Sequence, residues 1–154
     1  MAQDIFIKIN GIDGESQDAV HKNEIEVKKW NWEISQQSTM HMGSGGGGKA
    51  TVDDLTFEHL VDRASPNLMK YCLTGKHIDQ AVLTVRKAGS NPLEYLRITM
   101  GDVIVTSVQP SSSNSDTGIR EVVRLSFSRV KQEYVGQNAQ GGSGGAVTAG
   151  TTSS

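Results

Sequence analysis

The chain has 154 residues, which is the length of one domain, and its formal net charge is −2. Lys and Arg are scattered among the acidic residues, so the sequence lacks the basic field expected of a nucleic-acid-binding protein. The single cysteine, Cys72, excludes an intrachain disulfide and a zinc site built on several thiolates.

The N-terminal segment MAQDIFIKIN has no basic region followed by an apolar run, so it does not look like a signal peptide. No apolar stretch approaches the length that spans a bilayer. We therefore expect a protein that is made and folded in the cytoplasm and does not insert into a membrane.

The first expected strand covers residues 4–9, DIFIKI, whose three isoleucines share one face. The second covers residues 24–34, EIEVKKWNWEI, where the apolar residues change parity at residues 28 and 29. One extra residue in a strand moves every later side chain to the opposite face of the sheet, so this change of parity predicts a β-bulge. After the bulge, the side chains expected to face away from the core are those of Lys29, Asn31 and Glu33.

A long insertion at residues 36–50 follows, and part of it resembles a nucleotide-binding signature. Gly43, Gly48 and Lys49 fit G-x-x-x-x-G-K, but Ala50 stands where the motif has Ser or Thr. A phosphate-binding loop also needs a helix directly after the lysine, whereas an alternating, strand-like run follows here. The sequence therefore predicts a loop and not a phosphate site.

The segment Met40-His41-Met42 could be read as a soft-metal site, because thioether and imidazole groups suit copper(I). No second His or Cys lies nearby in the sequence, and the neighbouring glycines would not hold a fixed geometry. We favour a mobile apolar contact, since exposed methionines are typical of adaptable binding surfaces.

Further alternating segments lie at residues 53–59, 79–88, 93–108 and 119–130, separated by Gly, Pro and Ser-rich turns. About seven strands of this kind predict an all-β domain with one short helix. We expect an antiparallel β-barrel of two packed sheets, with the long glycine-rich loop between its second and third strands.

The segment SPNLMKYCLTG predicts the helix. Ser65 is the expected N-cap residue, Pro66 the first helical residue, and Gly75 the C-terminal stop. Leu68, Tyr71 and Cys72 then form one apolar face of a helix that closes an open end of the barrel.

The sequence divides into a barrel domain at residues 1–135 and a tail at residues 136–154. The tail, GQNAQGGSGGAVTAGTTSS, is of low complexity. It offers little apolar surface to offset the entropy of ordering it, so we expect it to be flexible.

No active site is visible, and we expect neither an enzyme nor a cofactor. Ser, His and Asp residues all occur, but nothing in the sequence favours their assembly into a catalytic triad. His21, His59 and His77 show no metal-binding spacing, and each is expected to be a surface or turn histidine. An enzymatic reading would need measurable binding of a nucleotide or a metal.

Several stretches together resemble one protein family over about residues 2–135. They are DIFIKINGIDGES, the run H-x-x-E-I-E-V-x-x-W-x-W, MHMGSGGGG, SPNLMKYCLTGKH, LTVRKAG and LEYLRITMGDVIVTSV. The combination resembles the haemolysin-coregulated proteins, the tube subunits of bacterial type VI secretion.

The resemblance implies an antiparallel β-barrel with a flanking helix that assembles as a homo-hexameric ring with a wide lumen. Such rings stack into a tube. A contractile sheath drives this tube outward, and a trimeric spike protein forms its tip. The tube itself is secreted, and small effector proteins ride inside the ring. The alternative is a secreted chaperone for effectors that does not build tubes.

The resemblance also implies sites. The residue between the two tryptophans, Asn31, points into the lumen, and we expect Lys29 and Glu33 to face it too, although exterior solvation is the alternative for these two. The long loop is placed at contacts between rings, which implicates Met40, His41, Met42, Gly43, Ser44, Gly45, Gly46, Gly47, Gly48 and Lys49. Many members end in an aromatic-containing segment, whereas this chain ends in GAVTAGTTSS.

Overall fold

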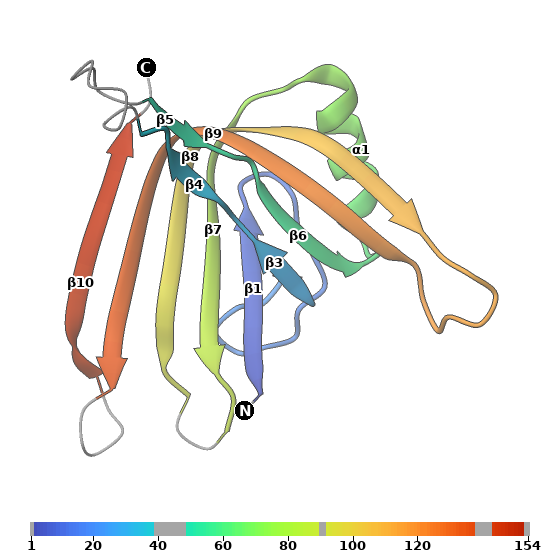
Figure 1. Ribbon diagram of the computed structural model, residues 1–154. Helices are drawn as coiled ribbons and strands as arrows, with labels where there is room; N and C mark the ends of the chain where they lie inside the picture. Colours follow the sequence, from blue (N-terminus) through green and yellow to red (C-terminus); the bar gives the residue numbers. More distant parts are fainter. Residues whose placement is uncertain (1, 39–48, 90–91, 138–142, 153–154) are drawn as a thin grey trace.

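The computed structural model describes residues 2–38, 49–89, 92–137 and 143–152, which form antiparallel strands and one helix (Figure 1). The strands are β1 (Gln3–Ile9), β2 (Ile25–Glu26), β3 (Lys29–Asn31), β4 (Ile34–Gln36), β5 (Ala50–Val52), β6 (Leu55–Leu60), β7 (Ile78–Lys87), β8 (Glu94–Ser111), β9 (Arg120–Gln137) and β10 (Ser143–Thr152). The helix is α1 (Ser65–Thr74). The expected class, all-β with one short helix, is confirmed.

The main sheet runs in the order β2-β1-β7-β8-β9-β6-β3, and β10 pairs with the C-terminal half of β9. β4 and β5 form a separate two-stranded ribbon. The main sheet curls around one core, so that β6 and β3 lie across the core from β1 and β7 (Figure 1).

The curled sheet is not a closed barrel, because β2 and β3 stand at the two ends of the sheet order and do not pair with each other. The short stretch of chain between them links the two ends. The Val27 N–H donates to the Ile5 carbonyl oxygen in β1 at 2.9 Å, and the Lys28 N–H donates to the Glu58 carbonyl oxygen in β6 at 2.8 Å. The parity change at residues 28 and 29 is therefore a change of partner strand, from β1 to β6. The predicted β-bulge is wrong, although the outward facing that it implied is retained.

The core is built by alternate residues of the curled sheet. Ile7 pairs with Leu83, which pairs with Ile98, so these side chains share one face of β1, β7 and β8. From the other side of the curl, Phe57 of β6 lies opposite Val123 of β9. All five are fully buried. Burying such a side chain stabilises the fold by about 1.5–3 kcal/mol.

The helix α1 packs its predicted apolar face against this core. Leu68 is fully buried, and Tyr71 and Cys72 are partly buried against the core cluster. Gly75 ends the helix in the left-handed conformation, with φ of 66°, and its N–H bonds to the Tyr71 carbonyl oxygen. Among the described residues, no helix is long and apolar enough to cross a membrane.

The start of α1 differs from the prediction. Ala64 and not Ser65 is the N-cap residue, and no side chain caps the helix. The Ser65 hydroxyl instead accepts the Asp62 N–H at 3.1 Å and donates to Glu121 at 3.0 Å. The Asp62 carboxylate organises the preceding turn, because it accepts the Ala64 N–H at 2.8 Å. A tertiary partner for the serine thus overrides its local capping preference.

The strand β10 differs from the flexible tail that its composition predicts. Val147 lies opposite Tyr134 of β9, and Thr148 lies opposite Glu133. Every side chain between residues 144 and 151 is exposed. The strand is therefore held by main-chain pairing, which needs no apolar side chains and leaves no signal in the composition. The division of the chain at residue 135 stays a prediction.

The segment between β1 and β2 folds back tightly on itself. The Gly14 N–H donates to the Asn23 carbonyl oxygen at 2.8 Å, and the Ser16 N–H donates to that of Glu24 at 3.0 Å. Arg63, just before α1, donates to the Gly14 carbonyl oxygen through Nε and Nη2. This segment therefore links β2 to the start of the helix.

The close approach at Gly14 gives a test of this packing. A Cβ at Gly14 would lie 2.5 Å from the Glu24 carbonyl oxygen and 2.8 Å from the Ile25 Cα, both main-chain atoms that cannot rotate away. We expect Gly14→Ala to lower the free energy of unfolding by about 2–3 kcal/mol in urea denaturation. The control is Gly118→Ala, whose Cβ would meet Leu60 at an ordinary 3.6 Å. Equal stability of the two variants would contradict the account.

Candidate functional site

β3 carries the central residues of the candidate site. It pairs with β6 so that Trp30 lies opposite Phe57. Trp30 and Trp32 both pack against the core, and the Trp32 indole N–H donates to the Asp53 carbonyl oxygen at 2.9 Å. The two indole rings therefore fix which way this stretch of chain faces.

Lys29, Asn31 and Glu33 are all exposed, as the alternation predicts. Their direction follows from the tryptophans, because successive side chains of a strand point to opposite sides. The structure thus leaves the three predicted lumen residues on the side away from the core. Their role in a lumen stays a prediction.

The same outward face continues across β6 and β9, which the sequence analysis did not identify. Asn31 lies opposite Thr56, and Thr56 lies opposite Arg124. Lys29 lies opposite Glu58. Residues that pair in register share a face, but the register of strands so far apart in the chain cannot be read from alternation alone.

Acidic and basic side chains on this face are paired. Arg120 Nη1 lies 3.4 Å from Glu58 Oε2, and Arg124 Nε lies 3.8 Å from Asp54 Oδ2. The Thr106 hydroxyl donates a 2.6 Å hydrogen bond to Asp54. Exposed pairs of this kind add only about 0–1 kcal/mol each to stability. Their effect here is to leave the face polar with its charges balanced.

The predicted ring-stacking loop is carried on the ribbon of β4 and β5. Ile34 lies opposite Val52, and the Gln37 N–H donates to the Lys49 carbonyl oxygen at 3.2 Å. All side chains of both strands are exposed, as is Lys49. The other predicted stacking residues, 40–48, lie outside the described residues.

The residues after the glycines do not form the helix that a phosphate-binding loop needs. Ala50 begins β5, so a strand follows Lys49 directly. This geometry agrees with the interpretation of the stretch as a loop between strands. In the part of the chain that the structure describes, no three His, Cys, Asp or Glu side chains are grouped so as to hold a metal ion.

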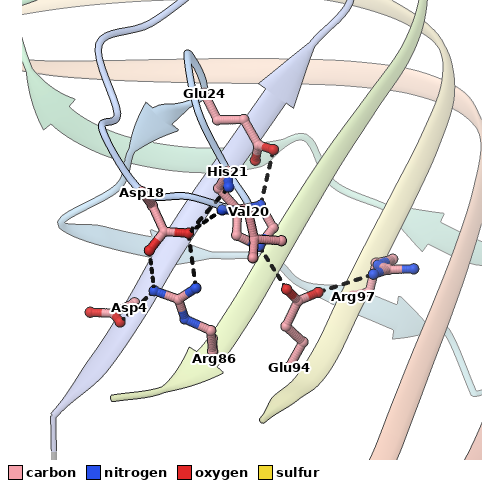
Figure 2. Close-up of polar contacts among 8 residues, drawn as sticks. All are labelled: Asp4, Asp18, Val20, His21, Glu24, Arg86, Glu94 and Arg97. Atoms are coloured by element: carbon pink, nitrogen blue, oxygen red, sulfur yellow. Dashed lines mark hydrogen bonds and ion pairs between the residues drawn. The ribbon is translucent and has the colours of Figure 1, made fainter. Parts of the chain in front are cut away.

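A polar cluster fastens the segment before β2 to β1 and β7 (Figure 2). Arg86 donates to both Asp18 carboxylate oxygens, at 3.0 and 2.7 Å, and to Asp4 at 2.9 Å. Asp18 also accepts the N–H groups of Val20 and His21. The hydrogen bonds from Arg86 hold the pKa of Asp18 far below its ordinary value, and they raise the pKa of Arg86 itself.

His21 extends this cluster towards β8 (Figure 2). Its ring stacks on Phe6 with centroids 4.5 Å apart, while Nδ1 lies 2.9 Å from Glu24 and Nε2 lies 2.8 Å from Glu94. Burial works against ionisation of Glu94, but the hydrogen bonds with His21 and then Arg97 lower its pKa. His21 is buried, and it belongs to the framework around β1 and not to the outward face of β3.

A second buried network joins β6, β9 and α1. His59 Nε2 lies 2.8 Å from Glu121 Oε1, and the Ser65 hydroxyl donates to the same oxygen at 3.0 Å. The expectation that His59 is a surface or turn histidine is wrong. It alternates with Leu55 and Phe57 on the core side of β6, where Glu121 supplies the partner that a buried imidazole needs.

This network does not have the order of contacts of a catalytic triad. A serine nucleophile needs its hydroxyl on the imidazole and the carboxylate on the far side of the ring. Here Ser65 bonds to Glu121, which also bonds to His59. Both groups therefore brace the carboxylate and hold the start of α1 to the sheet.

The comparison with known proteins identifies the family. A family model described as the type VI secretion system effector Hcp matches residues 6–134. The chain belongs to the Hcp family. The resemblance to the haemolysin-coregulated proteins is thereby confirmed.

Individual relatives cover nearly the whole chain. Protein hcp1 of Pseudomonas aeruginosa is 48% identical over 147 residues, which are 94% of this chain and 91% of that protein. The crystal structure of Hcp1 from Salmonella typhimurium matches with 59% identity and a TM-score of 0.82, covering 99% of this chain and 95% of that one. Another type six secretion system protein matches with a TM-score of 0.92 at 28% identity, covering 98% and 96% of the two chains.

The buried network at His59 gives a pH-dependent prediction. Burial works to lower the pKa of His59, but Asp62 and Glu121 outweigh it and raise that pKa above 6.5. When the pKa of a histidine is higher in the folded state than in the unfolded state, its protonation stabilises the fold at pH values below the unfolded-state pKa. This stabilisation is lost as the pH rises through the folded-state pKa. We expect the free energy of unfolding to fall as the pH rises above the ordinary histidine pKa of about 6.5, and to fall less in Glu121→Gln.

The measurement is urea denaturation at several pH values. Glu121→Gln should also be less stable by about 1–3 kcal/mol at the lower pH, because a buried charge-assisted bond is lost. The control, Asp116→Asn, changes a carboxylate in the exposed turn before β9 and should keep the wild-type slope. Equal slopes in wild type and Glu121→Gln would contradict the assignment.

Proposed function

We propose that this chain is the structural subunit of a type VI secretion tube and assembles into hexameric rings that stack end to end. The observation that carries the proposal is the match to the Hcp family over almost the whole chain, at 48% identity to Protein hcp1. We propose a structural and not an enzymatic role, because the family is one of secretion proteins.

The proposed lumen surface is the outward face of β3. Asn31 is a short polar residue between two inward tryptophans, and the row through Thr56 and Arg124 extends the face. Its balanced charges offer hydrogen bonds without strong ionic attraction, which suits a small effector protein that must be held loosely and released. For Lys29 and Glu33, exterior solvation is the alternative role.

The proposed stacking element is the ribbon of β4 and β5 with residues 40–49 at its end. Its described side chains are exposed, including the apolar pair Ile34 and Val52, so the ribbon adds nothing to the core of its own subunit. We propose that the assembled tube meets the trimeric spike protein at its end and the contractile sheath along its outside.

We further propose that the protein is made in the cytoplasm and leaves the cell with the tube. The family description, a type VI secretion system effector, supports export by this route. The same description also favours the second candidate function, a secreted chaperone that binds effectors in a ring without building tubes. The two candidates differ in whether the rings stack.

The proposal is tested by light scattering coupled to size-exclusion chromatography, followed by negative-stain imaging of the peak. We expect a mass near that of six subunits, annular particles, and tubes when the protein is concentrated. Rings that never stack would favour the chaperone. A monomer at every concentration would contradict both candidates.

The lumen assignment is tested by Asn31→Arg, which places a long charged side chain at the centre of the proposed surface. We expect rings of unchanged mass and a loss of effector binding of at least about tenfold, because the added charge must be desolvated against the bound protein. Asn31→Ser keeps a small polar group and should bind as the wild type does. The readout is pull-down of co-expressed effector. Loss of the ring in Asn31→Arg would contradict the placement of Asn31.

A further inference from the structure

The outward face of β3, β6 and β9 holds a small pocket, which we call the Val122 pocket. Its volume is about 120 Å³, and its lining includes Lys29 and Asn31 of β3, Thr56 and Glu58 of β6, and Val122 of β9. The three strands pair in register here, because Lys29 lies opposite Glu58 and Glu58 lies opposite Val122. Residues directly opposite each other share a face. The pocket therefore lies within the surface that we propose as the lumen.

Val122 supplies apolar surface to this pocket. It is half-buried and lies on the outward face of β9, whereas the next residue, Val123, is fully buried on the core side. Its cross-strand neighbours on the outward face, Glu58 and Gln109, are polar. A small-molecule or side-chain pocket is typically built in this way, with an apolar lining that holds the group and a few polar groups that orient it.

Contacts behind and beside the pocket hold its walls in place. His59 and Glu121, each next in sequence to a pocket residue, lie opposite each other and interact at 2.8 Å on the core side of the same two strands. On the outward side, Arg120 Nη1 lies 3.4 Å from Glu58 Oε2. A pocket whose walls are already fixed loses little conformational entropy when a group enters it, so a weak contact there is not offset by ordering.

The size and charge of the pocket select the group that fits it. A cavity of about 150 Å³ holds a benzene ring, and this pocket, at about 120 Å³, is smaller and suits a branched aliphatic side chain. Lys29 and Glu58 line it with opposite charges, so it attracts neither an acidic nor a basic side chain. A charged group would also lose hydration on entering. Asn31 and Thr56 offer an amide and a hydroxyl group to the polar atoms around the bound side chain.

We propose that the Val122 pocket takes one branched aliphatic side chain, of Val, Leu or Ile, from the surface of an effector in the lumen. The effector surface around that side chain is polar and forms hydrogen bonds with Asn31 and Thr56. Because a ring repeats the pocket in every subunit, several weak contacts act together, and the cargo is held without any one tight contact. This inference rests on the proposed lumen and states which effector chemistry the lumen recognises.

The first test measures the preference of the pocket itself, without an effector. In a Cys72→Ser background, Asn31→Cys places a thiol at the pocket. Disulfide probes that carry an isobutyl, methyl, benzyl or aminoethyl group are then exchanged onto this thiol in a thiol buffer. We expect capture of the isobutyl probe to exceed that of the methyl probe at least about tenfold, because its additional carbon atoms leave water. The captured fractions are read by mass spectrometry of the intact protein.

Two controls show whether the preference comes from the pocket. Ser107→Cys places the thiol on the same outward face, opposite Arg124 and outside the pocket, and should capture the four probes alike. Val122→Thr, added to the Asn31→Cys variant, keeps the shape of the side chain but replaces a methyl group by a hydroxyl group. It should abolish the preference for the isobutyl probe.

The second test asks whether an effector uses the pocket, with the same co-expressed effector that tests Asn31. We expect Val122→Thr to lower its recovery in the pull-down at least about tenfold, because the pocket then presents a hydroxyl group to an aliphatic side chain. The light-scattering mass of the ring should stay that of the wild type. Ile104→Thr is the control, on the same face of β8 opposite Ser126 and outside the pocket, and should recover the effector as the wild type does.

The outcomes separate this inference from the proposed function. A wild-type monomer that binds no effector would overturn the proposed function and, with it, the effector as the occupant of the pocket. Equal capture of the isobutyl and methyl probes, or a preference for the benzyl or aminoethyl probe, would overturn the aliphatic pocket and leave the ring standing. Unchanged recovery of the effector by Val122→Thr rings would overturn the role of the pocket in effector binding.

Discussion

The structure depends on two consecutive backbone hydrogen bonds that tie the two edges of the main sheet together. Val27 bonds to Ile5 in β1, and the next residue, Lys28, bonds to Glu58 in β6. Without this crossing, the two ends of the sheet would not be linked, and the apolar face of the sheet would remain uncovered. The crossing encloses the core and turns the following tryptophans inward. It thereby also directs Asn31 outward, so the same crossing that links the two ends of the sheet sets the facing of the candidate site.

Polar side-chain contacts fix the segments that are not paired in the main sheet. Asp18 and Arg86 fasten the segment before β2, and His59 with Glu121 holds the start of α1 (Figure 2 shows the first of these). A buried polar group without a partner is costly, so each of these contacts specifies one arrangement of its segment. They are framework contacts, and they lie apart from the exposed face of β3, where the proposed contact with effectors is polar and charge-balanced.

Alternation predicted the long strands and the outward facing of Asn31, and the helical spacing of apolar residues before Gly75 predicted the helix. Each of these depends on residues close together in the chain. The rest depends on contacts between distant segments. The parity change at residues 28 and 29 has the same sequence pattern whether it forms a bulge or a change of partner. Ser65 is a favourable N-cap residue until Glu121 comes within reach. β10 is ordered by pairing with β9, which composition cannot reveal.

The molecule is asymmetric, because β10 and the C-terminal half of β9 extend the sheet on the side away from β3 and β6 (Figure 1). The most direct test is a cryo-electron-microscopy reconstruction of the assembled wild-type protein. The account predicts a hexameric ring in which Asn31 faces the channel. A ring with Asn31 on its outer wall would contradict it.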